Sequence, residues 1–220
     1  IGIRGIADNA LIMSVRAVPD GDERDKDIAN AIRYAVDNGA KVINMSFGKG
    51  YSPGKKYVDD AVKYAVKKDV LLVHAAGNSS ENNDSTENYP NDIYSKKGLF
   101  GKKSANNWIE VGAMDWHGGE DQAAEFSNFG KNNVDLFAPG VDIYSTVPDQ
   151  GYKNANGTSM ASPVVAGVAA MLRSYFPTLT AQDTKDILLK SSRKLDVKVK
   201  KPGSDVLVPF SDLSATGGYI

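Results

Sequence analysis

A serine stands at the start of an apolar segment, in Asn156-Gly157-Thr158-Ser159-Met160-Ala161-Ser162-Pro163. Residues 164–172 are almost all apolar, which predicts a buried helix behind the serine. Unpaired backbone N–H groups and the positive end of the helix dipole converge at a helix N-terminus. A hydroxyl at that point suits attack on a carbonyl, because the resulting oxyanion is stabilised beside it. The alternative interpretation is that Thr158 or Ser159 only caps the helix.

A base for this serine would have to be His74, His117 or a group outside the chain, since the sequence contains two histidines. A nucleophile elbow of the α/β-hydrolase kind is excluded, because that fold needs a histidine after the serine. The glycine-rich stretch Gly48–Lys55 is excluded as a phosphate-binding loop, because Lys56 stands where a Ser or Thr must bind magnesium. No pair of histidines has ligand spacing, and we therefore predict no metal ligands.

Composition limits the function classes. With 220 residues, 41% of them hydrophobic, we expect residues 1–220 to form a single globular domain. The net charge of −1 gives no indication of nucleic-acid binding. No apolar run reaches the roughly 18 residues of a membrane span, and the N-terminus does not resemble a signal peptide. Cysteine is absent, which excludes disulfides and thiolate metal sites.

The elements that must position the serine alternate along the chain. Residues 27–38 predict a helix, because Ile28, Ala31, Ile32 and Ala35 share one face. A second helical pattern carries Val58, Ala61, Val62, Ala65 and Val66. We expect strands at 11–18, 42–46, 70–73, 108–114 and 134–137, a surface loop at 79–107, and a helix at 180–191. Thr180 and Asp183 resemble a capping box at the start of that last helix.

Strands and helices in this order predict an α/β fold, with a parallel sheet covered by helices. Ligands in such sheets bind beyond the carboxyl ends of the strands. Ser46–Gly48 and Ala75–Asn78 both follow predicted strands. Two glycine-containing segments are therefore expected near one another at the same edge, which independently supports a site there.

Four motifs, taken together, identify a family. Asn44-Met45-Ser46-Phe47-Gly48, Ala75-Ala76-Gly77-Asn78, Ala138-Pro139-Gly140 and the segment around Ser159 occur in the order found in subtilisin-like serine proteases, the subtilases. The resemblance covers nearly the whole chain. It implies a three-layer α/β sandwich with a mostly parallel central sheet, and a serine endopeptidase that hydrolyses peptide bonds.

The resemblance also implies roles for individual residues. Ser159 would be the nucleophile that forms an acyl-enzyme, and Asn78 would donate its amide to the oxyanion beside the Ser159 N–H. Asn78 could otherwise be only a turn residue after a strand. The pocket for the substrate side chain would have two walls, one formed by Ser46, Phe47 and Gly48 and the other by Ala75, Ala76 and Gly77.

The sequence departs from the family in one respect. Subtilases have an aspartate motif and a His-Gly-Thr-His motif before the region that matches Ile1–Ile3, and neither occurs here. Neither His74 nor His117 stands where the family keeps its base. The chain resembles the C-terminal portion of a subtilase catalytic domain, truncated at both ends, whose partner is the missing N-terminal part. We expect these residues alone to have negligible peptidase activity. The alternative is a non-catalytic binding or scaffold domain derived from a subtilase.

Cations are a further implication of the resemblance. A family calcium loop uses main-chain oxygens at positions that match Ile1 and Ile3, but its other ligands are missing from this sequence. We therefore expect no cofactor in this chain, although calcium is possible in the full-length protein. Asp135 matches a residue of a weaker cation site, and it could equally be an exposed strand carboxylate.

The segment Gly21–Glu23 would pair with the substrate as an added strand. Asp20, Asp22, Glu23 and Asp25 make that edge acidic, which suggests either a preference for basic residues upstream of the cut or a solvated acidic loop. By resemblance to bacterial subtilases we expect a secreted or cell-envelope protein.

Overall fold

The central feature is a mostly parallel sheet. A computed structural model describes residues 2–18, 21–95 and 103–220. Four parallel neighbours form most of the sheet: β1 (Val42–Met45), β2 (Leu71–Ala75), β3 (Trp108–Met114) and β4 (Leu136–Pro139). Beyond β4 lie β10 (Gly218–Tyr219), which is parallel, and the antiparallel edge strand β7 (Arg193–Lys194).

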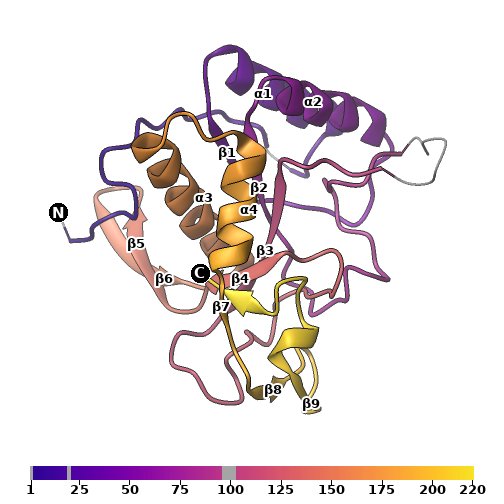
Figure 1. Cartoon of the computed structure of the whole chain (residues 1–220), viewed down its shortest axis with the longest axis vertical. Helices are drawn as coiled ribbons and strands as arrows, with labels where there is room; N and C mark the ends of the chain where they lie inside the picture. Colours follow the sequence, from indigo (N-terminus) through magenta and orange to yellow (C-terminus); the bar gives the residue numbers. More distant parts are fainter. Residues whose placement is uncertain (1, 19–20, 96–102) are drawn as a thin grey trace.

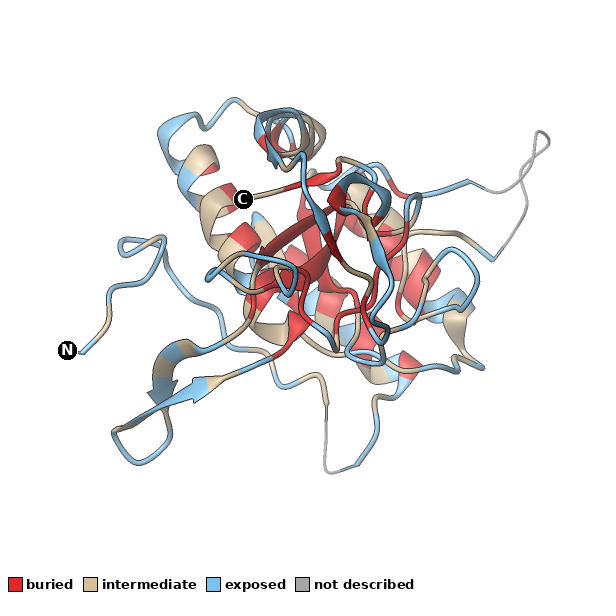
Figure 2. Cartoon of the chain, turned by 90° about the horizontal axis from the view of Figure 1, so that it is seen from below, coloured by how far each residue is buried: buried red, intermediate tan, exposed pale blue. Residues whose placement is uncertain are grey.

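Helices cover both faces of the sheet (Figure 1). One face carries α1 (Asp25–Asp37) and α2 (Lys55–Lys67), and the other carries α3 (Thr158–Tyr175) and α4 (Ala181–Ser191). Side chains alternate along β2, so that Leu72 joins the core under α1 and α2 while Leu71 and Val73 join the core under α3 and α4. Figure 2 shows the buried residues gathered on the central strands. The predicted three-layer α/β architecture is confirmed.

The elements of these layers follow the sequence pattern closely. The helices predicted at 27–38 and 180–191 and the four sheet strands predicted after residue 25 occur within two residues of their expected bounds, whereas the helix predicted over 164–172 extends over Thr158–Tyr175. Along α2 the buried apolar residues recur at helical spacing, which is why this segment packs as a helix: Val58, Ala61, Val62 and Ala65. The expected capping box is present, since Thr180 Oγ1 accepts a hydrogen bond from Asp183 N and the Asp183 carboxylate accepts one from Thr180 N.

The predicted strand at 11–18 is wrong. This segment forms no ladder with any strand in the described residues, and Leu11 and Ile12 are almost fully exposed. An apolar alternating pattern produces a strand only where a neighbouring strand accepts its hydrogen bonds. The described part of the expected loop 79–107 contains no helix or strand, as predicted.

Smaller elements were not predicted from the sequence. Two antiparallel hairpins lie outside the main sheet, with a short 3₁₀ helix after the second: β5 (Ile143–Val147) with β6 (Gly151–Ala155), β8 (Lys198–Lys200) with β9 (Leu207–Pro209), and η1 (Phe210–Asp212). The N-terminal segment lies beside the first hairpin (Figure 1), where Gly2 N donates to the Tyr152 hydroxyl at 3.0 Å. No helix in the described residues is long and apolar enough to cross a membrane.

Candidate active site

Ser159 lies in the first turn of α3. The N-cap is Gly157, which has a φ of +150° and no side chain to cap the helix, and Thr158 is already the first helical residue. The interpretation that Thr158 or Ser159 only caps the helix is therefore wrong. The half-buried Ser159 side chain donates instead to the carbonyl oxygen of Ser46, at 3.2 Å from Oγ.

A reciprocal pair of hydrogen bonds joins Ser159 to the end of β1. The Ser46 hydroxyl donates to the main-chain carbonyl of Ser159 at 2.9 Å. That carbonyl would normally accept the N–H of the residue four positions later, but this residue is Pro163, which has none. Ser46 therefore satisfies a carbonyl that the helix cannot, and it holds both the backbone and the hydroxyl of Ser159.

Asn78 is held beside the same turn by its side-chain oxygen. Asn78 Oδ1 accepts hydrogen bonds from both Thr158 N and Thr158 Oγ1, each at 2.9 Å. With Oδ1 engaged in this way, the amide nitrogen Nδ2 is the free end of the carboxamide. A methyl group built on Gly157 would lie 3.5 Å from this nitrogen, so the amide approaches the helix start closely.

Ser159 and Asn78 line one cavity of about 360 Å³. Four of the predicted wall residues line it with them, two from each proposed wall: Phe47, Gly48, Ala75 and Gly77. Ser46 and Ala76 do not line the cavity. Ser46 lies behind it and bonds Ser159, while Ala76 is fully buried and its carbonyl accepts hydrogen bonds from Asn83 and Asn88.

Several asparagines support the second wall, and sequence reasoning missed them. Asn88 and Asn128 also line the cavity, and Asn128 Oδ1 accepts the N–H groups of Ser79 and Glu81. Gly77 has a φ of +110°, and a Cβ there would come within 2.6 Å of Asn128 Nδ2. The only available signal was the asparagine-rich composition of the loop, which does not indicate which backbone groups the amides bind.

Neither histidine contacts Ser159 in the hydrogen bonds of the described residues. His74 is fully buried, with its ring between Glu110 and the Phe47 carbonyl. His117 lies in an exposed turn, where it pairs with Asp115. The geometry therefore brings the Ser159 hydroxyl and the Asn78 amide to one cavity, while these hydrogen bonds of His74 and His117 go to other groups.

One carboxylate of the acidic edge, Asp25, is paired with a lysine. Asp25 is buried and contacts Lys49 Nζ at 3.0 Å, and it accepts hydrogen bonds from Ser52 and Gly54. Burial raises the pKa of Asp25, but the hydrogen bonds outweigh it and hold the pKa below its ordinary value. Asp25 is thus a structural carboxylate, and Asp20 lies outside the described residues.

Asp135 does not fit a cation site. Its Oδ2 accepts the Glu110 N–H at 2.8 Å, and its Oδ1 lies 3.2 Å from the Lys185 ammonium. Burial raises the pKa of Asp135, and the Lys185 charge opposes that rise. Both carboxylate oxygens of Asp135 therefore already have protein partners, which does not fit a role as a metal ligand. Ile1 lies outside the described residues, and those residues contain no group of three or more His, Asp or Glu that could hold an ion.

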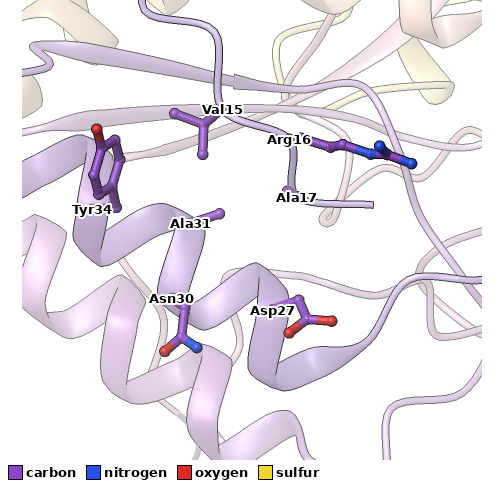
Figure 3. Close-up of a pocket in the computed structure, with 7 residues that line it drawn as sticks. All are labelled: Val15, Arg16, Ala17, Asp27, Asn30, Ala31 and Tyr34. Atoms are coloured by element: carbon purple, nitrogen blue, oxygen red, sulfur yellow. The ribbon is translucent and has the colours of Figure 1, made fainter. Parts of the chain in front are cut away.

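A second cavity, of about 320 Å³, lies between residues 15–17 and α1 (Figure 3). Its polar lining includes Asp27, Asn30 and Tyr34. Neither Ser159 nor Asn78 lines it, so the predicted site residues lie at the other cavity, beside α3.

The family model described as "Subtilase family" matches residues 1–207. The chain belongs to the subtilase family. This subtilase chain is 44% identical over 174 residues to the thermophilic serine proteinase of Bacillus sp. (strain AK1), a match that covers 79% of this chain and 38% of that relative. It is 36% identical over 196 residues to subtilisin DY of Bacillus licheniformis, covering 88% of this chain and 65% of the relative.

A solved structure supports the subtilase fold. A cold adapted subtilisin-like serine proteinase superposes with a TM-score of 0.74 at 29% identity, and the match covers 96% of this chain and 68% of that structure. The chain spans less than two thirds of the length of both sequence relatives described above.

Proposed function

We propose that the natural protein containing this chain is a serine endopeptidase that acts through an acyl-enzyme on Ser159. One observation carries the proposal: the Ser159 hydroxyl, in the first turn of α3, and the Asn78 carboxamide line the same cavity. The two relatives compared above, named as a serine proteinase and a subtilisin, are in agreement.

In the proposed reaction, Ser159 Oγ attacks the carbonyl carbon of the scissile peptide bond. The oxyanion that forms accepts hydrogen bonds from the Ser159 N–H, which lies in the first helical turn, and from Asn78 Nδ2. Collapse of this intermediate expels the amine and leaves an ester on Ser159, which water then hydrolyses. Since Thr158 already holds the Asn78 amide, the donors are oriented before the substrate binds.

The base that accepts the Ser159 proton comes, in this proposal, from outside the 220 residues. His74 and His117 both have other partners. The chain then acts as the C-terminal portion of a catalytic domain, and its partner is the N-terminal portion that carries the base and the acid that orients it. A triad without these members retains only weak catalysis, so we expect negligible turnover by the chain alone.

Labelling with a fluorophosphonate probe tests the proposal. The natural protein should be labelled and should hydrolyse a peptide ester, and Ser159→Ala should abolish both. Ser174→Ala is the matched control, because Ser174 is exposed near the other end of α3. Failure of the natural protein to label or hydrolyse would overturn the proposal in favour of a binding or scaffold domain.

A secreted or cell-envelope location is part of the same proposal. Family membership alone leaves the compartment open, because another relative is named a major intracellular serine protease. Fractionation of the source cells with an antibody to this chain tests the location, and recovery only in the cytosol would contradict it.

We also propose that the natural protein binds calcium. Measuring the bound metal after gel filtration tests this proposal.

A further inference from the structure

His74 is a fully buried histidine in β2 that the proposed reaction does not use. Its Nε2 lies 2.7 Å from the carbonyl oxygen of Phe47. A carbonyl oxygen can only accept a hydrogen bond, so Nε2 must carry a hydrogen. On the other side of the ring, Nδ1 lies 2.9 Å from Glu110 Oε1.

The contact between His74 and Glu110 needs a hydrogen of its own. A neutral imidazole with its hydrogen on Nε2 has a lone pair on Nδ1, and an ionised carboxylate presents only lone pairs. One additional proton must therefore lie in this contact, either on the imidazole or on the carboxyl group. The second oxygen of Glu110 has its own donor, because Trp108 Nε1 lies 2.7 Å from Oε2.

We propose that His74 and Glu110 share one buried proton at Nδ1, which fixes the ring so that its Nε2–H donates to the Phe47 carbonyl, and that His74 is therefore a positioning residue for the cavity wall. Phe47 lines the cavity and directly follows Ser46, whose carbonyl accepts the Ser159 hydroxyl. By fixing the ring, the shared proton holds the Phe47 carbonyl, which belongs to the residue next to Ser46, the acceptor of the Ser159 hydroxyl.

Apart from Glu110 itself, the charged groups of this region lie near Glu110, and the imidazole ring of His74 contacts aromatic rings. Asp135 Oδ2 accepts the Glu110 N–H, and Lys185 pairs with Asp135 at 3.2 Å. Burial raises the pKa of Asp92 to about 6, and Lys185 opposes this while Asp135 and Glu110 add to it. The His74 ring itself packs against the Phe47 and Trp108 rings. Lys185 therefore forms its ion pair with Asp135, and the Glu110 carboxylate contacts His74.

Proton, nitrogen-15 and carbon-13 NMR of the 220-residue chain tests the shared proton. His117, which is exposed, serves as the internal control and should show no slowly exchanging ring hydrogen. We expect two slowly exchanging hydrogens at His74, one on Nε2 that couples to the Phe47 carbonyl carbon and one in the contact between Nδ1 and Glu110. A single such hydrogen at His74, or no coupling to Phe47, would overturn the proposal.

Glu110→Gln separates the proton from the hydrogen bonds. A glutamine amide can donate to Nδ1 and accept from Trp108, which keeps the contacts without the extra proton. In E110Q the hydrogen in the contact with Nδ1 should be bonded to the glutamine nitrogen, and the ring should keep one hydrogen, on Nε2. His117→Gln should leave both His74 signals as they are in the unaltered chain.

Both His74 signals unchanged in E110Q would contradict the proposal. The NMR measurement on the unaltered chain decides it even if this variant does not fold. The shared proton does not depend on the proposed peptidase activity, whereas its effect on a substrate rests on that activity. The NMR measurements need no substrate. They can therefore fail while the fluorophosphonate test succeeds, or succeed while that test fails.

Discussion

Asn78 combines a structural and a proposed chemical role in two different atoms. Its Oδ1 holds Thr158, while its Nδ2 is the proposed oxyanion donor. Asn78→Asp keeps an acceptor for Thr158 but replaces the donor with a negative oxygen. In the natural protein we expect kcat to fall by at least about 10²–10³, a magnitude established for loss of this kind of donor in subtilisin itself.

The melting temperature of the same variant separates the two roles. It should stay within about 3 °C of the unaltered protein, because the bonds to Thr158 survive. Unchanged kcat with a large loss of stability would mean that Asn78 has only its structural role.

Ser46 is expected to contribute to stability through the carbonyl that Pro163 leaves without a donor. Ser46→Ala removes the hydroxyl that reaches the Ser159 carbonyl, so we expect the free energy of unfolding to fall by about 1–2 kcal/mol. Urea denaturation measures this. Ser46→Thr keeps a hydroxyl and is the control, and equal stability of the two variants would show that this hydrogen bond contributes nothing.

The candidate site could be proposed from the sequence to the extent that its residues are adjacent in motifs. Ser159 stands at the start of an apolar segment, so local order alone indicated it, whereas the role of Asn78 was implied only by the resemblance to the subtilases. The amides of Asn88 and Asn128 bind backbone groups far from them in sequence, and no local pattern encodes such a partner. The proton shared by His74 and Glu110 is hidden for the same reason.

At the scale of elements, α4 depends on its first turn. Thr180 and Asp183 satisfy each other's backbone N–H groups there. Thr180→Ala should therefore reduce the free energy of unfolding by about 1 kcal/mol. Urea denaturation against Thr180→Ser, which keeps the hydroxyl, measures the effect of the cap. Equal values for both variants would contradict it.

Elements with a buried face were predictable, and elements without one were not. In α1 and α2 the apolar residues recur at helical spacing because they pack against the sheet, and this spacing can be recognised in the sequence. Residues 11–18 have the pattern of a strand but no neighbouring strand, and the exposed hairpin of β5 and β6 lacks a continuous apolar face. Pairing between segments decides these cases, and a single segment does not contain that information.

For the molecule as a whole, Asp92 should make stability depend on pH. Burial raises its pKa from 3.8 to about 6, so the folded chain retains a proton that the unfolded chain has already lost. This contribution is present at pH 4 and is lost as the pH rises to about 6. Asp92→Asn should therefore stabilise the chain at pH 8 by roughly 1–3 kcal/mol, with little effect at pH 4.

Urea denaturation at both pH values measures this effect. Asp121→Asn is the control, because Asp121 is an exposed carboxylate on the surface. A lower stability of Asp92→Asn at pH 8 would show that the ionised carboxylate makes favourable contacts that outweigh its burial.

The proline in α3 also has an evolutionary consequence. Restoring an N–H at position 163 would supply the Ser159 carbonyl from within the helix, and the hydroxyl at position 46 would then become dispensable for stability. The losses from Ser46→Ala and Pro163→Ala should consequently be less than additive when the two are combined. Over long divergence these two positions, far apart in the gene, are expected to change together.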